Sequence, residues 1–242
     1  KKNVKSAIES IREKYYWPRV SIEKPIFIVG LQGGGLTLVR RILSRSTNTV
    51  SVGANNNNFA GQDEMQNASH LDLAEEFRLF YCKFFNEAPF YRGGWMYATD
   101  QYISHFRKSE DDFTPLLSDN FKKAIKKILI RKAINYNNVR FIDKSQSYGL
   151  KIPLINKILE KENPKFLVMT RDPYIAILKA IHKPALSMQD NLTIEQKIEL
   201  ACQHYKNTFE EVLRSKNKYN NVFIGKFEDF LDHPETWIEK TC

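Results

Sequence analysis

Residues 25–46 read PIFIVGLQGGGLTLVRRILSRS, an apolar run followed by a glycine-rich turn and an amphipathic segment. Laid against the phosphate-loop pattern G-x-x-x-x-G-K-[ST], the stretch places Gly30, Gly35 and Thr37 at matching positions, with Leu36 where the lysine would stand. Glycines allow successive N–H groups to converge on an anion, and a helix N-terminus adds partial positive charge. We therefore expect a phosphate-binding loop formed by Gln32, Gly33, Gly34, Gly35, Leu36, Thr37 and Leu38.

Leu36 restricts which phosphate ligand this loop is expected to bind. In nucleotide triphosphatases the loop lysine reaches the β- and γ-phosphates, so its replacement by leucine disfavours ATP hydrolysis. A 5′-phosphate bearing one further group is a better match. The alternative is that the glycines simply form a tight turn between a strand and a helix.

Short apolar runs alternate with longer amphipathic ones along the chain, which is typical of a parallel sheet covered by helices. The length of 242 residues suits one α/β domain over residues 1–242. The expected strands are Ile26–Val29, Val50–Val52, Val139–Ile142, Lys165–Thr170 and Val222–Gly225. The expected helices are Val4–Lys14, Thr37–Ser46, Leu71–Phe85, Asp119–Ala133, Leu150–Lys161, Pro173–Ile181, Ile194–Ser215 and Pro234–Lys240.

The composition of the chain limits which ligands and which cellular compartment are expected. A formal charge of +9 favours anionic ligands, and no zinc-finger, helix-turn-helix or RNA-sheet pattern indicates nucleic acid. The most apolar stretch, residues 25–30, is too short to span a bilayer. Three scattered cysteines and no targeting signal favour a cytoplasmic protein, although an anchor removed before Lys1 would imply a Golgi-type lumen.

A second anion site is expected after the fourth strand, in KFLVMTRDPYIAILKAIHK at residues 165–183. Arg171 follows the strand directly, and Lys179 and His182 lie one turn apart on the following helix. Two phosphate sites indicate a nucleotide phosphorylated at both ends. Alternatively, Arg171 only pairs with Asp172 or caps a helix.

In combination these segments resemble the sulfotransferases that use 3′-phosphoadenosine 5′-phosphosulfate (PAPS). Residues 30–37 align with the 5′ loop of that family, G-x-x-[RK]-S-G-T-[TS], and Arg171-Asp172-Pro173 with Lys179 resembles its 3′-phosphate motif. FIDKSQSYGLKIPLINKIL, at residues 141–159, is similar to its [DE]-K-[TS]-x segment. KFEDFLDHPETWIEK, at residues 226–240, resembles its Y-E-D-L-x-x-x-P stretch.

The resemblance implies a P-loop nucleotide-kinase-like (sulfotransferase) fold and sulfuryl transfer from PAPS, without a metal, to a hydroxyl or amine. The product would be 3′,5′-adenosine bisphosphate, and the acceptor a carbohydrate, lipid, peptide or small alcohol. Gly33 stands where the family has a lysine or arginine, and Lys179 where it has a serine. A glycine-rich loop expected near the C-terminus is not visible before Cys242, so either the chain is truncated there or its nucleotide binding is incomplete.

Sulfuryl transfer requires a cation at the leaving phosphate and a base for the proton of the acceptor. By resemblance Lys144 supplies the cation, with Arg40 and Arg41 as weaker candidates. Related sulfotransferases use a glutamate or histidine soon after the second strand, so Glu64 is the first candidate base and Asp63 the second. His182 is the rival candidate, because imidazole titrates near pH ~6.5.

Residues 53–101 interrupt the strand and helix alternation, and we expect this insertion on the substrate side. Phe77 belongs to an aromatic series at helical spacing and is assigned to the core, whereas Trp95 is a candidate for acceptor recognition. His105 and His204 receive no role. The alternative functions are a nucleotide or small-metabolite kinase, and a module that binds PAPS or its product with weakened catalysis.

Overall fold

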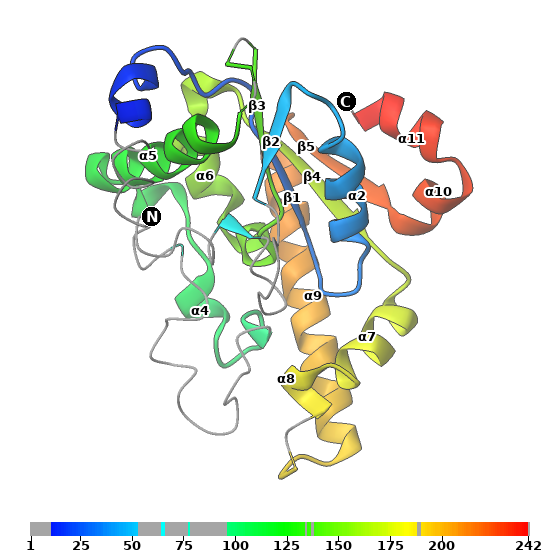
Figure 1. Cartoon of the computed structure of the whole chain (residues 1–242). Helices are drawn as coiled ribbons and strands as arrows, with labels where there is room; N and C mark the ends of the chain where they lie inside the picture. The colour runs from blue at the N-terminus through cyan, green and yellow to red at the C-terminus, as the bar shows by residue number, and fades with distance from the viewer. Residues whose placement is uncertain are drawn as a thin grey trace, which may run out of the picture.

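A computed structural model describes residues 11–52, 64, 65, 77, 96–133, 135, 136, 138–187 and 190–241. At its centre lies a parallel sheet of five strands in the order β2-β3-β1-β4-β5 (Figure 1). This confirms the expected α/β fold. The strands are β1 (Ile26–Gly30), β2 (Thr49–Ser51), β3 (Arg140–Asp143), β4 (Lys165–Thr170) and β5 (Val222–Lys226).

Strand β1 is buried along its whole length because helices cover both faces of the sheet. Side chains alternate between the faces of a strand, so Phe27 and Val29 join one core cluster while Ile26 and Ile28 join another. Figure 1 shows helices of the two layers on opposite sides of the sheet. The first layer contains α5 (Pro115–Lys132), α6 (Ile152–Ile158) and α9 (Ile194–Lys218); the second contains α2 (Leu36–Leu43), α10 (Phe227–Asp232) and α11 (Pro234–Thr241).

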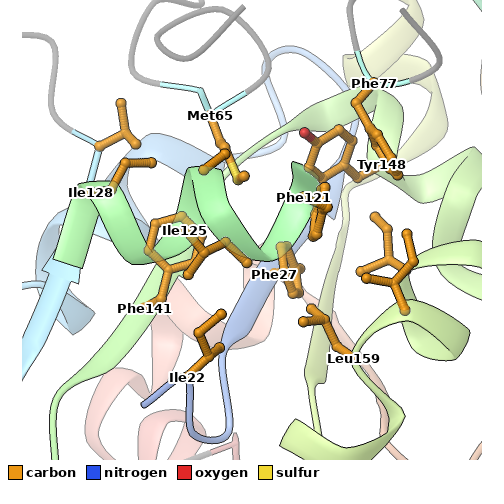
Figure 2. Packing of buried hydrophobic residues seen from close by; sticks show 14 of the residues in the cluster. Ile22, Phe27, Met65, Phe77, Phe121, Ile125, Ile128, Phe141, Tyr148 and Leu159 are labelled. Atoms are coloured by element: carbon orange, nitrogen blue, oxygen red, sulfur yellow. The ribbon is translucent and has the colours of Figure 1, made fainter. Parts of the chain in front are cut away.

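Phe27 is the centre of the larger cluster (Figure 2). Its ring centroid lies 6.2 Å from that of Phe121, 6.3 Å from those of Phe141 and Tyr148, and 5.6 Å from that of Phe166. These rings come from α5, β3, β4 and the segment after β3, so one side chain joins three strands to the helices above them. Aromatic pairs at such separations add to the stabilisation from buried area.

Local start and stop signals explain where the sequence predicted the elements correctly. Strand β4 and helix α7 (Pro173–Ile181) have the predicted bounds. The helix begins at Pro173 because the Asp172 side chain caps it, accepting a hydrogen bond from the Ile175 N–H at 3.0 Å. The start of α5 was predicted at Asp119 but lies at Pro115, where the Thr114 side chain accepts from Leu117 N–H.

The prediction of one continuous helix over Leu150–Lys161 was wrong. That region contains the end of η5 (Gln146–Lys151), then α6, then η6 (Glu160–Glu162). Four short elements were not predicted: α4 (Ile103–Phe106), η4 (Glu110–Asp112), α8 (Pro184–Ser187) and α10. Most of the 53–101 insertion, including nearly all of the expected Leu71–Phe85 helix, lies outside the described residues.

The strand order creates a crevice at the carboxyl ends of β1 and β4. The chain leaves β1 toward β2 on one side of the sheet and leaves β4 toward β5 on the other. Ligands of open α/β sheets bind where neighbouring connections diverge in this way. The glycine-rich loop follows β1 and Arg171 follows β4, so both candidate anion-binding segments lie at this crevice. Among the described residues, no helix is both long and apolar enough to cross a membrane.

Truncating Phe27 tests the central role of its ring. We expect Phe27→Ala to lower the free energy of unfolding by about 3–5 kcal/mol, because the side chain is fully buried and its removal leaves a cavity. Leu116→Ala is the matched control; its side chain is 70% exposed and its loss should change stability by about 0.5 kcal/mol or less. Urea unfolding followed by circular dichroism measures both, and equal losses would contradict the assignment.

Candidate functional site

The loop between β1 and α2 presents backbone N–H groups at the start of a helix. Gly34 N–H donates to the carbonyl of Leu31 at 3.0 Å, which closes the turn. Gly35 is the N-cap, in the left-handed region with φ 81°, and no side chain caps the helix. A Cβ at Gly35 would overlap the ring of Phe227, so only glycine fits there. The first N–H groups of α2, from Leu36 and Thr37, have no acceptor within the helix and suit an anion.

Arg171 and Lys179 both lie against this loop. The Arg171 Nη1 donates to the Gly33 carbonyl at 2.7 Å, and its guanidinium lies over the Phe227 ring, 5.0 Å from the centroid. A Cβ built at Gly33 would contact the Lys179 Cδ at 3.5 Å. The structure therefore places the Arg171 guanidinium and the stem of Lys179 beside the loop.

Gln32 and Leu38 occupy different surroundings at the two ends of the loop. Gln32 lines a small pocket together with Leu31, His204 and Tyr205. Leu38 is 43% exposed, whereas the next residue, Val39, is buried. The helix is oriented by its contacts with Phe227 and the sheet, and this orientation leaves Leu38 outside the core.

Lys144 and Glu64 form a buried ion pair. The Lys144 Nζ lies 3.1 Å from the Glu64 Oε1, and the two side chains are 4% and 0% exposed. Gln146 donates from Nε2 to the same oxygen at 3.3 Å. Lys144 directly follows β3, the strand beside β1, so the pair lies at the carboxyl edge of the sheet. The structure thus brings together the expected cation and the first-choice base.

Asp143 adds a second buried carboxyl group to this cluster. Its Oδ1 accepts the Met65 N–H at 2.8 Å, which anchors the chain next to Glu64. Burial raises the pKa of Asp143 to about 6, despite hydrogen bonds from Ser145 and Met65 and the nearby charge of Lys144. Burial, and to a lesser degree the Glu64 charge, raise the pKa of the Tyr97 hydroxyl as well. A neutral carboxyl group and a neutral phenol therefore neighbour the ion pair near pH 5.

The remaining candidates fall into two groups, those that the structure describes and those that lie outside the described residues. The Arg40 Nη1 donates to Ser51 Oγ at 3.0 Å, so it reaches toward β2, and Arg41 is exposed. His182 is exposed at the C-cap of α7. Asp63 and Trp95 lie outside the described residues.

Sequence reasoning missed His204 and the ring of Phe227. His204 is buried, its Nδ1 accepts the Ala98 N–H at 3.1 Å, and desolvation lowers its pKa to about 3. The imidazole is therefore neutral and carries its proton on Nε2. A lone histidine in a helix gives no sequence signal for such a contact, whereas Phe227 follows the last strand in the quoted KFEDF stretch. In the parts of the chain that the structure describes, no cluster of histidine, cysteine or acidic residues could hold a metal ion.

Stability should depend on pH through Asp143. Folding raises the pKa of Asp143 from 3.8 to about 6, so the folded protein favours the neutral carboxyl group. The resulting stabilisation is complete below pH 3.8, the pKa in the unfolded chain, and is lost as pH rises through about 6. Asp143→Asn removes this loss. We expect its stability relative to the unmodified protein to improve by up to ~3 kcal/mol between about pH 4 and pH 7.

Urea unfolding at both pH values measures this difference. Asp232→Asn, at an exposed position, is the matched control for the loss of one carboxylate. A relative stability of Asp143→Asn that stays constant between the two pH values would show that Asp143 does not titrate in this range.

Comparison with known proteins agrees with the fold described above. Sulfotransferase STF9 from Mycobacterium avium superposes with a TM-score of 0.59 at 12% identity, over 96% of this chain and 66% of that one. Sulfotransferase STF1 from Mycobacterium tuberculosis H37Rv gives 0.55 at 14% identity, over 96% and 70%. The chain thus spans about two thirds of the length of these structures, and no curated protein sequence matches it. The sequence profile of the sulfotransferase family matches residues 25–242, and the chain belongs to that family.

Proposed function

We propose that this protein transfers a sulfuryl group from PAPS to a hydroxyl or amine acceptor. One observation carries the proposal: the cation-lined glycine loop and the buried Lys144–Glu64 pair lie at the carboxyl ends of the neighbouring strands β1 and β3. The first feature suits the phosphates of a nucleotide, and the second suits a proton transfer. Family membership supports the same reaction.

The residues at the loop fit a nucleotide with phosphates at both ends. Arg171 Nε is buried and has no hydrogen-bond partner among the described residues, although Nη1 of the same guanidinium donates to Gly33. A buried donor without an acceptor is costly, and a phosphate oxygen would satisfy it. The N–H groups of Leu36 and Thr37 would hold the other phosphate. No lysine follows Gly35, which argues against a triphosphate.

Lys179 compensates for the glycine at position 33. The family has a basic residue at that position, and here the Lys179 stem lies where the Gly33 side chain would begin, with its Cβ 3.7 Å and its Cδ 3.5 Å from the built Cβ. The exposed Lys179 ammonium is thus carried to the loop by helix α7. We assign it to charge neutralisation at the donor phosphates.

Glu64 and Lys144 divide the chemical work. Bound PAPS would supply a sulfuryl group that is activated by its anhydride linkage to the 5′-phosphate. Glu64 accepts the acceptor proton as the new S–O or S–N bond forms, while the S–O bond to the phosphate breaks and that phosphate keeps the electron pair. Lys144 pairs with Glu64 before the transfer, and with the loop N–H groups it opposes the negative charge that develops on the phosphate.

Donor binding tests the loop assignment. We expect 3′,5′-adenosine bisphosphate to bind at least about tenfold more tightly than ATP with magnesium, because the loop lacks the triphosphate lysine. Arg171→Ala and Lys179→Ala should each weaken bisphosphate binding by about tenfold through lost charge-assisted contacts. Lys123→Ala, an exposed lysine on α5, is the control. Isothermal titration calorimetry measures all four proteins, and unchanged affinity in both loop variants would exclude this donor site.

Glu64→Gln tests the base. Glutamine keeps the size of the side chain and can still accept from Lys144 and Gln146, but it cannot take the acceptor proton. We expect turnover to fall by about 10²–10⁴ while bisphosphate affinity changes by less than about twofold. Release of bisphosphate from PAPS with a panel of hydroxyl and amine acceptors provides the turnover. Asp63→Asn and His182→Ala are the comparison variants, and a loss confined to either of them would transfer the role to that residue.

A further inference from the structure

A second cavity, of about 450 Å³, lies at the opposite edge of the sheet from the candidate site. It is lined where strands begin: Lys24 precedes β1, Arg140 opens β3 and Lys165 opens β4. Lys216 from α9 and Lys240 from α11 complete the ring of cations. Because all five strands are parallel, this amino edge is separated from the glycine loop by the length of β1, roughly 16 Å.

The lining of this cavity is strongly basic. It contains five lysine and arginine residues and no aspartate or glutamate. Within the described ranges, none of the five forms an ion pair, whereas many other basic residues of the chain do. Glu162, which adjoins the cavity in sequence, pairs instead with Lys122 at 2.8 Å. The cavity therefore gathers positive charge that the protein itself leaves uncompensated.

Several contacts fix the geometry of the lining. Arg140 Nε donates to the Lys24 carbonyl at 3.0 Å, which orients the guanidinium. Asn221 Nδ2 donates to Asn156 Oδ1 and to the Pro164 carbonyl, both at 2.8 Å. Lys24 and Asn163 both adopt left-handed backbone, with φ 43° and 51°. For a lysine this conformation is strained, and such strain concentrates where a structure holds a ligand.

We propose that this cavity binds a small ligand or lipid headgroup that carries two or three phosphate groups. A phosphate monoester carries a charge of about −1.5 to −2 at neutral pH, so two or three phosphate groups balance the five cations of the lining. A ligand with carboxylate groups would need five of them to carry the same charge. The planar fork of Arg140 and the side-chain amide of Asn220 suit phosphate oxygens, while the two hydrogen bonds donated by Asn221 hold this part of the lining in place. The volume lies in the range of small-molecule sites. The site is separate from the donor site and does not depend on the proposed reaction.

Inositol 1,4,5-trisphosphate is the soluble probe for this site. We expect calorimetry at low salt to show one bound molecule whose affinity falls with ionic strength. Lys165→Ala/Lys216→Ala/Lys240→Ala should weaken binding at least about tenfold, since three charged donors are removed. Lys14→Ala/Lys123→Ala/Lys206→Ala removes the same charge from exposed positions elsewhere and should bind within about twofold of the unmodified protein.

Two further measurements distinguish the donor site and the source of the ligand. Arg171→Ala/Lys179→Ala should retain trisphosphate binding, which separates this cavity from the glycine loop. Sedimentation with phosphatidylcholine vesicles, with and without phosphatidylinositol 4,5-bisphosphate, shows whether the headgroup on a membrane is bound as well as the free ligand. Undetectable binding of both probes, equal losses in the two triple variants, or loss confined to Arg171→Ala/Lys179→Ala would each overturn the proposal.

Discussion

Pairing of β1 on both edges is the constraint on which the rest of this structure depends. Its backbone hydrogen-bonds to β3 and β4, and its side chains are buried against helices on both faces. Because both edges and both faces of such a strand are covered, only the residues at its two ends can contact a ligand. At its end the chain turns through glycines into α2, and at its beginning Lys24 adopts left-handed backbone. Both cation-rich regions of the molecule follow from this arrangement.

The Lys144–Glu64 pair shows that stability alone does not account for this site. Burying two charges carries a desolvation cost that their attraction offsets only in part, and apolar residues of similar size often give a more stable core. The pair is nonetheless almost completely excluded from solvent. Around it, burial raises the pKa values of Asp143, Tyr97 and Tyr148, so below a pH of about 6 charge is confined to the pair itself. This confinement strengthens the electrostatic effect of Lys144 on any charge that develops nearby.

The sequence predicted those features that short segments encode. Strand β4 and helix α7 were predicted to the residue, because Asn163-Pro164 and Asp172-Pro173 mark the boundaries of the strand and the helix. The contact between Lys144 and Glu64 joins residues 80 positions apart, and the hydrogen bond from Arg171 to Gly33 spans 138. The four residues of these two contacts could each be named from a motif. No local pattern predicts that the partners lie close together, because their distance depends on which strands pair in the sheet. His204 was missed for the same reason: its partner, Ala98, is 106 residues away.

The exchange of charge between positions 33 and 179 keeps the number of cations at the loop constant relative to the family pattern. Glycine replaces a basic residue at one position, and lysine replaces a serine at the other. The stem of Lys179 lies against Gly33, so helix α7 brings a lysine side chain beside the position that is basic in the family pattern. A flexible lysine loses more side-chain entropy when it is fixed than a serine does. In the proposed reaction, part of its attraction for the donor phosphates would therefore be offset by the entropy lost on ordering the side chain, while its charge would remain available when the leaving phosphate becomes more negative. By this reasoning Lys179 would contribute more to the transfer step than to donor binding.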